Sequence, residues 1–249
     1  MSKKIKIIKY LFAFIFVPTA IVSSIYYLNQ SGFFNIDKIE ITVENMVNQP
    51  QYLQPLVKKL DQTIEVARGT SLWSINLNQL NQKINQYDWI QSMNISRQWP
   101  SQLSVKLTVK EVKALIISQN GKLLPVVDEG AYLNSVEVGE APDAAFLFGK
   151  EFEKNKELRK KAIQFIDELP SEGAFSKKTI SEIHYEEKEG FWLNLVKDNL
   201  KVKIGHDQIS MKSARVSQVI DYIESRKMNA RVIDANLSKK VLVRLRKDP

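Results

Sequence analysis

The residues best suited to acid–base or metal chemistry in this chain are its two histidines, His184 and His206. His184 lies in an alternating segment in which Glu182 and Glu186 have the same parity, and one imidazole with two carboxylates can hold a metal ion. His206 lies in a turn further along the chain. No other ligand converges on either histidine, so a solvated strand face explains His184 more simply than a metal site does. The sequence therefore predicts no metal, no cofactor and no catalytic residue.

Sequence signatures of common enzyme classes are missing. The chain has no G-x-S-x-G nucleophile elbow, no H-E-x-x-H zinc motif and no phosphate-binding P-loop. It has no cysteine, which excludes disulfides and thiolate zinc ligands. A pair of carboxylates for glycoside hydrolysis stays open, since such pairs come from distant positions. We therefore predict a binding protein, with an enzyme as an alternative that would need convergent carboxylates or a histidine site in one cleft.

The N-terminus predicts a membrane anchor. Residues 10–28 read YLFAFIFVPTAIVSSIYYL without a charge, and a helix of this length spans about 28 Å, against a hydrocarbon core of about 30 Å. Four lysines precede this run, and the positive-inside rule places residues 1–9 in the cytoplasm and the bulk of the chain across the membrane. A cleaved signal peptide is the alternative, but the run is long and no A-x-A-like site follows it. We expect a retained single-pass anchor in the inner (cytoplasmic) membrane.

The charge of the chain is mildly positive outside this anchor. The whole chain has 36 basic and 28 acidic residues, a net charge of +8, and residues 1–30 contribute four lysines and no acid. The basic residues elsewhere are scattered and lack the interleaved aromatics of a nucleic-acid site. We expect no nucleic-acid partner, and the remaining charge suits solubility or an anionic membrane surface nearby.

The clearest element after the anchor is a β-hairpin over residues 88–114. Its apolar residues fall on odd positions on both sides of a Pro-Ser break: Met93, Ile95, Trp99, Leu103, Val105, Leu107 and Val109. This alternation predicts two strands with one buried face. Pro100 fixes the turn. Arg97 is also at an odd position, on the face expected to be buried. Its charge therefore needs a bulge, an acidic partner or a path round the sheet rim to solvent.

A strand and two helices are predicted to precede and cover this hairpin. The strand lies over 36–43, the first helix over 52–60 with Pro55 in its first turn, and the second over 76–86 with Asn76 as N-cap. The resulting order is strand, helix, helix, strand, strand. We expect Trp73, Trp89 and Trp99 to close the ends of this core, a commoner role for tryptophan than ligand stacking.

The second half of the chain predicts a sheet with flanking helices. One helix is expected over 153–169, and another over about 208–226 with Met211, Val219, Ile220 and Ile223 facing inward. Strands are expected over 180–185, 191–196, 200–204, 231–235 and 240–246. The last strand has no later strand to cover it, so its edge is open to a partner strand.

A β-α-α-β-β module directly after one anchor resembles a POTRA domain. The segments GTSLWSI (69–75), WI (89–90) and ISRQWPSQLSVKLTVKEVKA (95–114) resemble the FtsQ/DivIB family of bacterial cell-division proteins. The matching residues are Gly69, Leu72, Trp73, Trp89, Ile90, Arg97, Trp99, Pro100, Leu103, Val105, Val109, Glu111 and Ala114. The sequence departs from the family at Lys113, where a proline is common, at residues 44–45, where a glycine often follows the first strand, and after Asp234, where an arginine is expected.

The resemblance implies an α+β chain with a cytoplasmic tail (1–9), a single transmembrane helix (10–28), a POTRA domain (34–112) and a mixed β-sheet domain with flanking helices (113–249). It implies a scaffold of the division complex at the septum, which links early and late division proteins and controls septal wall synthesis through FtsB and FtsL. The resemblance and the open edge together place the FtsB contact at Ile233, Leu237, Val241, Val243 and Leu245. Arg97, Trp99 and Pro100 are expected to be a structural motif of the POTRA domain.

Two other classes of function remain as alternatives. One is a wall-modifying enzyme, and the other is an anchored extracytoplasmic sensor or ligand-binding module. A pocket large enough for a small molecule would favour it. Our main interpretation expects no small-molecule substrate.

Overall fold

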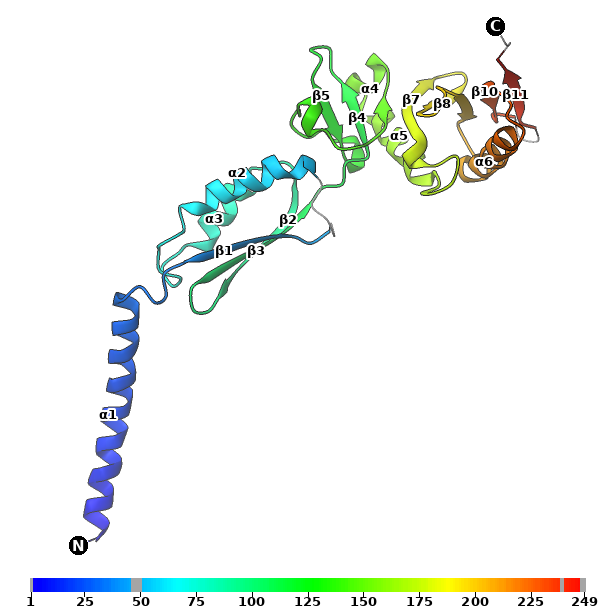
Figure 1. The fold of residues 1–249 in the computed structure, drawn as a ribbon. Helices are drawn as coiled ribbons and strands as arrows, with labels where there is room; N and C mark the ends of the chain where they lie inside the picture. The colour runs from blue at the N-terminus through cyan, green and yellow to red at the C-terminus, as the bar shows by residue number, and fades with distance from the viewer. Residues whose placement is uncertain (1, 46–50, 238–239, 247–249) are drawn as a thin grey trace. The chain divides into compact units, whose positions relative to one another are not determined.

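The computed structural model describes residues 2–45, 51–237 and 240–246, with side chains within 14–45, 52–237 and 240–246 (Figure 1). The chain divides into two compact units, residues 1–109 and 110–249. The elements of the first unit are α1 (Ser2–Gln30), β1 (Lys38–Val43), the 3₁₀ helix η1 (Gln51–Leu53), α2 (Gln54–Glu65), α3 (Leu77–Ile84), β2 (Ile90–Gln98) and β3 (Gln102–Val109).

The helix α1 covers the apolar N-terminal run and contains Pro18. Within the part of the chain that the structure describes, no helix is both long and apolar enough to cross a membrane. In the predicted span, the structure describes no side chains for residues 10–13.

The first unit is built on a three-stranded sheet in the order β1-β3-β2, with β3 parallel to β1 and antiparallel to β2. The odd-numbered apolar side chains of β3 are fully buried, as the alternation predicted: Leu103, Val105, Leu107 and Val109. They pack in one core with apolar residues of α2 and α3, among them Leu60, Ile64 and Ile84. The predicted order of strand, helix, helix, strand, strand is confirmed.

Local signals place both helices of this unit. Asn76 caps α3 as predicted, because its side-chain oxygen accepts hydrogen bonds from the amides of Asn78 and Gln79 at 3.1 and 3.2 Å. Pro55 lies in the first turn of α2, where no amide is needed. The helix α2 runs on to Glu65, past the predicted end, because Ile64 continues its buried stripe.

The prediction that three tryptophans close this core is wrong for two of them. Trp73 and Trp99 are 59% and 52% exposed. Trp99 follows the last residue of β2 and lies in the turn to β3, where strand alternation no longer sets the direction of a side chain. Trp89 is half-buried, with its ring centroid 5.9 Å from that of Tyr52.

The second unit contains strands, helices and short 3₁₀ helices. Its strands are β4 (Ala114–Ile117), β5 (Leu123–Val126), β6 (Phe146–Leu147), β7 (Ile180–Glu186), β8 (Gly190–Leu195), β9 (Lys201–Gly205), β10 (Ala230–Asp234) and β11 (Leu242–Leu245). Its helices are η2 (Asp128–Gly130), η3 (Val138–Glu140), α4 (Lys150–Lys154), α5 (Lys156–Glu168), η4 (Lys177–Thr179) and α6 (Ile209–Ser225).

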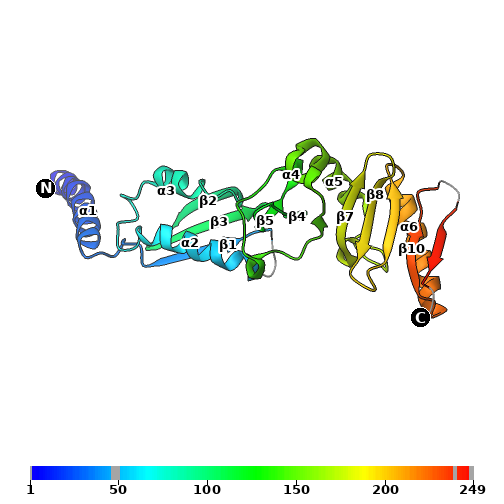
Figure 2. The same ribbon diagram turned by 90° about the horizontal axis from the view of Figure 1, so that it is seen from above.

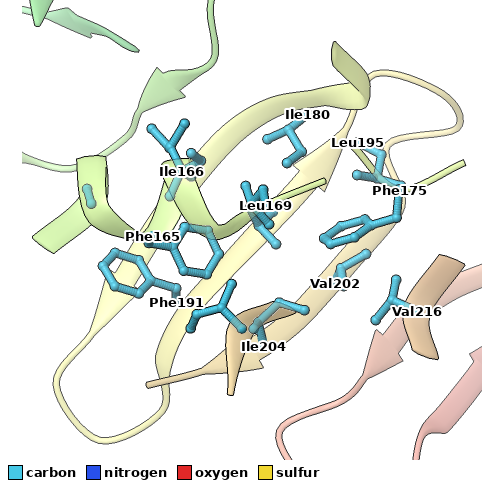
Figure 3. Close-up of a cluster of buried hydrophobic side chains, with 14 of the residues drawn as sticks. Phe165, Ile166, Leu169, Phe175, Ile180, Phe191, Leu195, Val202, Ile204 and Val216 are labelled. Carbon is cyan, nitrogen blue, oxygen red and sulfur yellow. The ribbon is translucent and has the colours of Figure 1, made fainter. Parts of the chain in front are cut away.

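These strands form one eight-stranded sheet in the order β11-β10-β9-β8-β7-β6-β4-β5. The helices α5 and α6 pack against it through apolar side chains, and Figure 3 shows Phe165 of α5 and Leu169, which directly follows α5, among side chains of β7, β8 and β9. The predicted meander is confirmed, because β7, β8 and β9 pair antiparallel in chain order. The mixed α+β class predicted from sequence is therefore confirmed.

Two details of the predicted helices are wrong. The helix expected over 153–169 is split into α4 and α5, because Asn155 is extended and caps α5 by accepting a hydrogen bond from the amide of Leu158 at 3.0 Å. Met211 is 42% exposed. The buried stripe of α6 instead includes Ile209, Val216, Ile220 and Ile223, and this spacing leaves Met211 beside the stripe.

Candidate functional site: the C-terminal edge of the sheet

The strand β11 forms the outer edge of the second unit's sheet (Figure 2). It pairs antiparallel with β10, with Val243 opposite Ile233 and Leu242 opposite Asp234. The strand β10 in turn lies parallel to β9. All four residues of β11 are exposed. Within the described ranges, no strand pairs with the outer side of β11, so this side is an open edge.

The direction of the backbone groups on this edge follows from one hydrogen bond. The amide of Arg246 donates to the carbonyl of Asn229 at 2.8 Å, so the peptide groups of Arg246 face β10. Peptide groups alternate along a strand, so those of Val243 and Leu245 point away from β10. Their N–H and C=O groups are placed to pair with an added strand.

The predicted partner-binding residues divide into two sets. Ile233 is fully buried in the core, and Val241 is half-buried against it. Leu237, Val243 and Leu245 are 50%, 36% and 52% exposed. Residues 238 and 239, between β10 and β11, lie outside the described residues. The buried pair therefore holds the hairpin to the sheet, and the exposed residues are accessible to a partner.

The surface at this edge is basic. Arg231, Lys240, Arg244 and Arg246 are all exposed. A guanidinium nitrogen of Arg246 also donates to the carbonyl oxygen of Asp198. An acidic or mixed-charge segment would complement this edge better than a basic one.

Buried polar contacts hold the strands behind this edge. The ammonium group of Lys212, with a side chain 3% exposed, donates to the carbonyl of Ile204 at 3.0 Å and to the carboxylate of Asp207 at 2.7 Å. The hydrogen bond from Lys212 lowers the pKa of Asp207. At Gly205, φ is +92°, and a Cβ atom would lie 2.0 Å from Oδ1 of Asn236, so a side chain there would displace the loop after β10.

The solvated strand face expected for His184 is wrong, because its side chain is only 13% exposed. The Nε2 of His184 lies 2.9 Å from Oε2 of Glu182, but Glu186 instead accepts a hydrogen bond from the indole of Trp192 at 3.0 Å. Among the described residues, no group of three or more histidine, aspartate or glutamate side chains is placed to hold a metal ion. The imidazole stacks on Trp192, and the ammonium of Lys201 lies 3.3 Å from the centroid of the same indole ring.

Burial lowers the pKa of His184 below its ordinary value, although Glu182 acts in the opposite direction. The hydrogen bond from His184 lowers the pKa of Glu182. This part of the sheet is thus a packed polar and aromatic surface that keeps the imidazole neutral at neutral pH.

A surface cavity of about 370 Å³ also lies in the second unit. Its lining includes Lys113, Phe146, Ile166 and Lys177. The ammonium of Lys113 is paired with Glu111 at 3.0 Å and with Asp167 at 3.2 Å. The volume falls in the range of small-molecule pockets, about 300–1,000 Å³. The charge of Lys113 is already neutralised by the carboxylates of Glu111 and Asp167.

The predicted Arg97–Trp99–Pro100 motif joins two parts of the first unit. Arg97 is exposed, and its guanidinium donates to the carbonyls of Leu72 at 2.7 Å and Ile75 at 2.9 Å. Of the three alternatives expected for Arg97, its exposure agrees with a path to solvent, and its partners are backbone oxygens and not an acidic side chain. Trp99 lies on the surface, and Pro100 forms the turn.

Two buried cations in the second unit escaped the sequence analysis. Arg159, 6% exposed, donates to the carbonyls of Gly130 and Phe152 at 2.7 and 2.8 Å. Lys212 is the other. Both lie next to apolar positions of a helix that also carries exposed charged residues. From sequence alone, a buried basic side chain at such a position cannot be told from an exposed one. Neither has a sequence signal that distinguishes it from its exposed neighbours.

Comparison with known families covers most of the chain. Residues 34–108 match the family model for the POTRA domain, FtsQ-type, and residues 109–236 match that for the C-terminal region of cell division protein FtsQ/DivIB. The second match ends before β11. The position of the edge strand therefore rests on the structure.

Individual relatives agree with these matches. Cell division protein FtsQ of Syntrophotalea carbinolica is 20% identical over 222 residues, covering 86% of this chain and 75% of the relative. The FtsQ protein of a Geobacter species is 26% identical over 186 residues, covering 72% and 67%. Cell division protein DivIB of Solibacillus silvestris is 29% identical over 145 residues, covering 57% and 46%.

Proposed function

This chain belongs to the FtsQ/DivIB family of cell-division proteins, and we propose that it is a membrane-anchored, non-catalytic scaffold of the division complex. In this proposal, residues 1–9 are a cytoplasmic tail, 10–28 a transmembrane anchor, 34–112 the POTRA domain and 113–249 the partner-binding domain. The scaffold lies at the septum, where it links early and late division proteins and controls septal wall synthesis.

The proposed anchor is supported by the helix α1 and by sequence. The helix contains the uncharged run 10–28, and four lysines precede that run. Apolar side chains of the helix are exposed, including Phe14, Val22 and Ile25. Exposed apolar side chains around a helix suit a lipid environment. The lysines then favour a cytoplasmic N-terminus.

The proposed binding site is the open edge of β11, and the observation that carries it is the outward direction of the peptide groups at Val243 and Leu245. An extended segment of a partner adds to this edge as a ninth strand by main-chain hydrogen bonds. The exposed Val243 and Leu245 side chains then supply apolar contacts, and the basic side chains favour an acidic partner. The family resemblance indicates FtsB, with FtsL, as the partner.

The test is capture of FtsB and FtsL from the same bacterium by the full-length protein in detergent. Val243→Pro removes an outward N–H, and Val243→Glu adds a charge to the same edge. Each is expected to weaken capture at least tenfold, or by about 1.4 kcal/mol. Thermal unfolding followed by circular dichroism should remain close to wild type, because β11 is exposed along its length.

Two matched controls separate the edge from general damage. Val243→Thr keeps a β-branched side chain and the amide, so capture should stay within about twofold of wild type. Val196→Glu places the same charge on another exposed valine of the second unit, 69% exposed, and should leave capture unchanged. Unchanged capture by the folded Val243→Pro variant would show that the partner binds elsewhere.

The alternative function is ligand binding or sensing by the second unit. The cavity near Lys113 is the observation that favours it. A cavity ligand should be displaced when the cavity is filled, for example by Ala145→Trp, while capture of FtsB is kept. Native mass spectrometry of the protein purified from its own membranes would test this. If no small molecule is bound to the wild-type protein and lost from Ala145→Trp, only the scaffold function remains.

A further inference from the structure

An exposed aromatic cluster lies on the first unit, and neither the core nor the proposed partner edge accounts for it. It consists of Phe33, Phe34, Trp73 and Trp99, and we call it the aromatic cluster. The ring centroids of Trp73 and Trp99 are 4.2 Å apart, and that of Phe34 lies 5.7 Å from Trp99 and 6.1 Å from Trp73. Phe33, Trp73 and Trp99 are each at least half exposed.

The backbone holds this cluster in place. The amide of Leu72 donates to the carbonyl of Phe34 at 2.8 Å, and the amide of Asp37 donates to the carbonyl of Ser101 at 2.9 Å. Arg97 adds its two hydrogen bonds to the segment around Trp73. Three segments distant in sequence are thus fixed together, and the exposed rings are a built surface.

The polar atoms of the two tryptophans are also available. Among the described residues, no protein group accepts a hydrogen bond from the indole N–H of Trp73 or Trp99, whereas that of Trp192 donates to Glu186. An indole with an apolar ring and an unused N–H prefers the interface between lipid and water, where its ring meets acyl chains and its N–H meets headgroup oxygens.

The chain connection keeps this cluster close to the proposed anchor. Only residues 31 and 32 separate Gln30, the last residue of α1, from Phe33. Three backbone steps span at most about 11 Å. The headgroup layer on each side of a bilayer is about 5–7 Å thick. Phe33 therefore cannot lie far from that layer if residues 10–28 cross the membrane, and Tyr26 and Tyr27 mark the end of the same span.

We propose that the aromatic cluster inserts into the interfacial layer of the bilayer that α1 crosses, and thereby orients the first unit against the membrane. The occupant is the lipid headgroup and upper acyl region. The proposal rests on the proposed anchor and adds a second, peripheral contact to it. The contact restricts the directions in which the rest of the chain extends from the membrane.

The test uses full-length protein in vesicles whose lipids are brominated near the headgroup end of the acyl chains. Bromine quenches tryptophan only at contact distance, and α1 contains no tryptophan, so selective excitation reports on the folded units alone. The variant Trp89→Phe/Trp192→Phe keeps only Trp73 and Trp99. The matched variant Trp73→Phe/Trp99→Phe keeps only Trp89 and Trp192.

We expect brominated lipid to reduce the emission of the first variant at least twofold and to leave that of the second unchanged. The wild-type protein, which needs no substitution, should show quenching between the two. Equal quenching in both variants, or none in the first, overturns the proposal. Absence of quenching would then assign the cluster to a protein partner.

A separate measurement keeps the anchor and the cluster distinguishable. After an alkaline wash, the amount of protein that floats with the same vesicles reports whether the chain is integrally inserted. Flotation without quenching of Trp73 and Trp99 rejects the interfacial contact and leaves the anchor. Loss of flotation rejects the anchor, and the interfacial contact with it.

Discussion

His184 lies on the indole of Trp192, with 3.6 Å between ring centroids and 6° between ring planes. Its ring also lies 4.8 Å from that of Phe148. The charged groups around it are Glu182 at hydrogen-bond distance, Lys201 on β9 and Glu186 at the end of β7. Burial outweighs the carboxylates, so the pKa of the imidazole falls. A residue that suggested metal chemistry thus packs the sheet as a neutral ring.

This environment predicts how stability depends on pH. The unfolded chain takes up a proton at His184 below pH 6.5, the ordinary value, while the folded chain resists it until a lower pH. Stability is therefore lost as the pH falls below 6.5, with a slope of at most about 1.4 kcal/mol per pH unit for this one proton. Calorimetric unfolding between pH 7 and about pH 5 should show the loss, since few other side chains titrate there.

The variant His184→Phe isolates this contribution. It keeps a ring against Trp192 but cannot take up a proton. The free energy of unfolding of the variant should therefore rise relative to that of the wild type as the pH falls. Glu182 acts in a lower window, because its lowered pKa stabilises the fold above 4.5 and this contribution is lost only as the pH falls further. If the unfolding free energies of variant and wild type change with pH in parallel, the proposed burial effect is contradicted.

The hairpin of β2 and β3 organises the first unit from its central strand. The strand β3 supplies the fully buried row, and the turn after β2 carries Trp99. Arg97 joins β2 to the segment that leads into α3, through two carbonyl oxygens. One side chain therefore fixes both sides of the aromatic cluster.

Removing this guanidinium should weaken the first unit. Arg97→Ala loses two hydrogen bonds from a charged donor, and with partial exposure we expect a loss of about 1–2 kcal/mol. Arg97→Lys keeps the charge without the planar fork and should fall between alanine and wild type. Urea unfolding of the full chain in a Trp192→Phe background makes tryptophan fluorescence report the first unit alone.

Lys106→Ala is the matched control on the neighbouring strand. Its ammonium lies 3.4 Å from Glu44, and both side chains are 51% exposed. Exposed pairs of this kind contribute about 0–1 kcal/mol. If Arg97→Ala costs no more than Lys106→Ala, the contacts to Leu72 and Ile75 do not stabilise the unit.

The whole molecule combines a basic N-terminus, an apolar helix and two folded units with separate cores. The proposed partner edge lies at the end of the second unit's sheet, and the aromatic cluster lies in the first unit where the chain enters it. In the proposed function, the bilayer and the partner therefore bind at opposite ends of the sequence.

The absence of cysteine makes the proposed topology directly testable. Ser2→Cys and Lys188→Cys each introduce a single thiol, the second in an exposed turn between β7 and β8. A membrane-impermeant maleimide applied to spheroplasts should label Lys188→Cys and spare Ser2→Cys until the membrane is opened. Labelling of both, or of Ser2→Cys alone, would reject an N-terminus in the cytoplasm.

Much of the fold is predictable because its signals are local. Alternation over 102–109 predicted a strand with a buried face, Asn76 predicted the start of α3, and the spacing of turns predicted the meander. Asn155 shows a limit, since its capping contact overrode an amphipathic pattern that continued through it. Met211 shows another, because the register of a buried stripe depends on what the helix packs against.

The sequence by itself determined the composition, the anchor-like run, the order of elements in the first unit and the family resemblance, because these depend on residue type and spacing along the chain. The tertiary structure alone decided which rings are exposed, which carbonyls bind Arg97, and which way Val243 and Leu245 direct their peptide groups. Such properties arise where distant segments meet. No spacing within one segment encodes them.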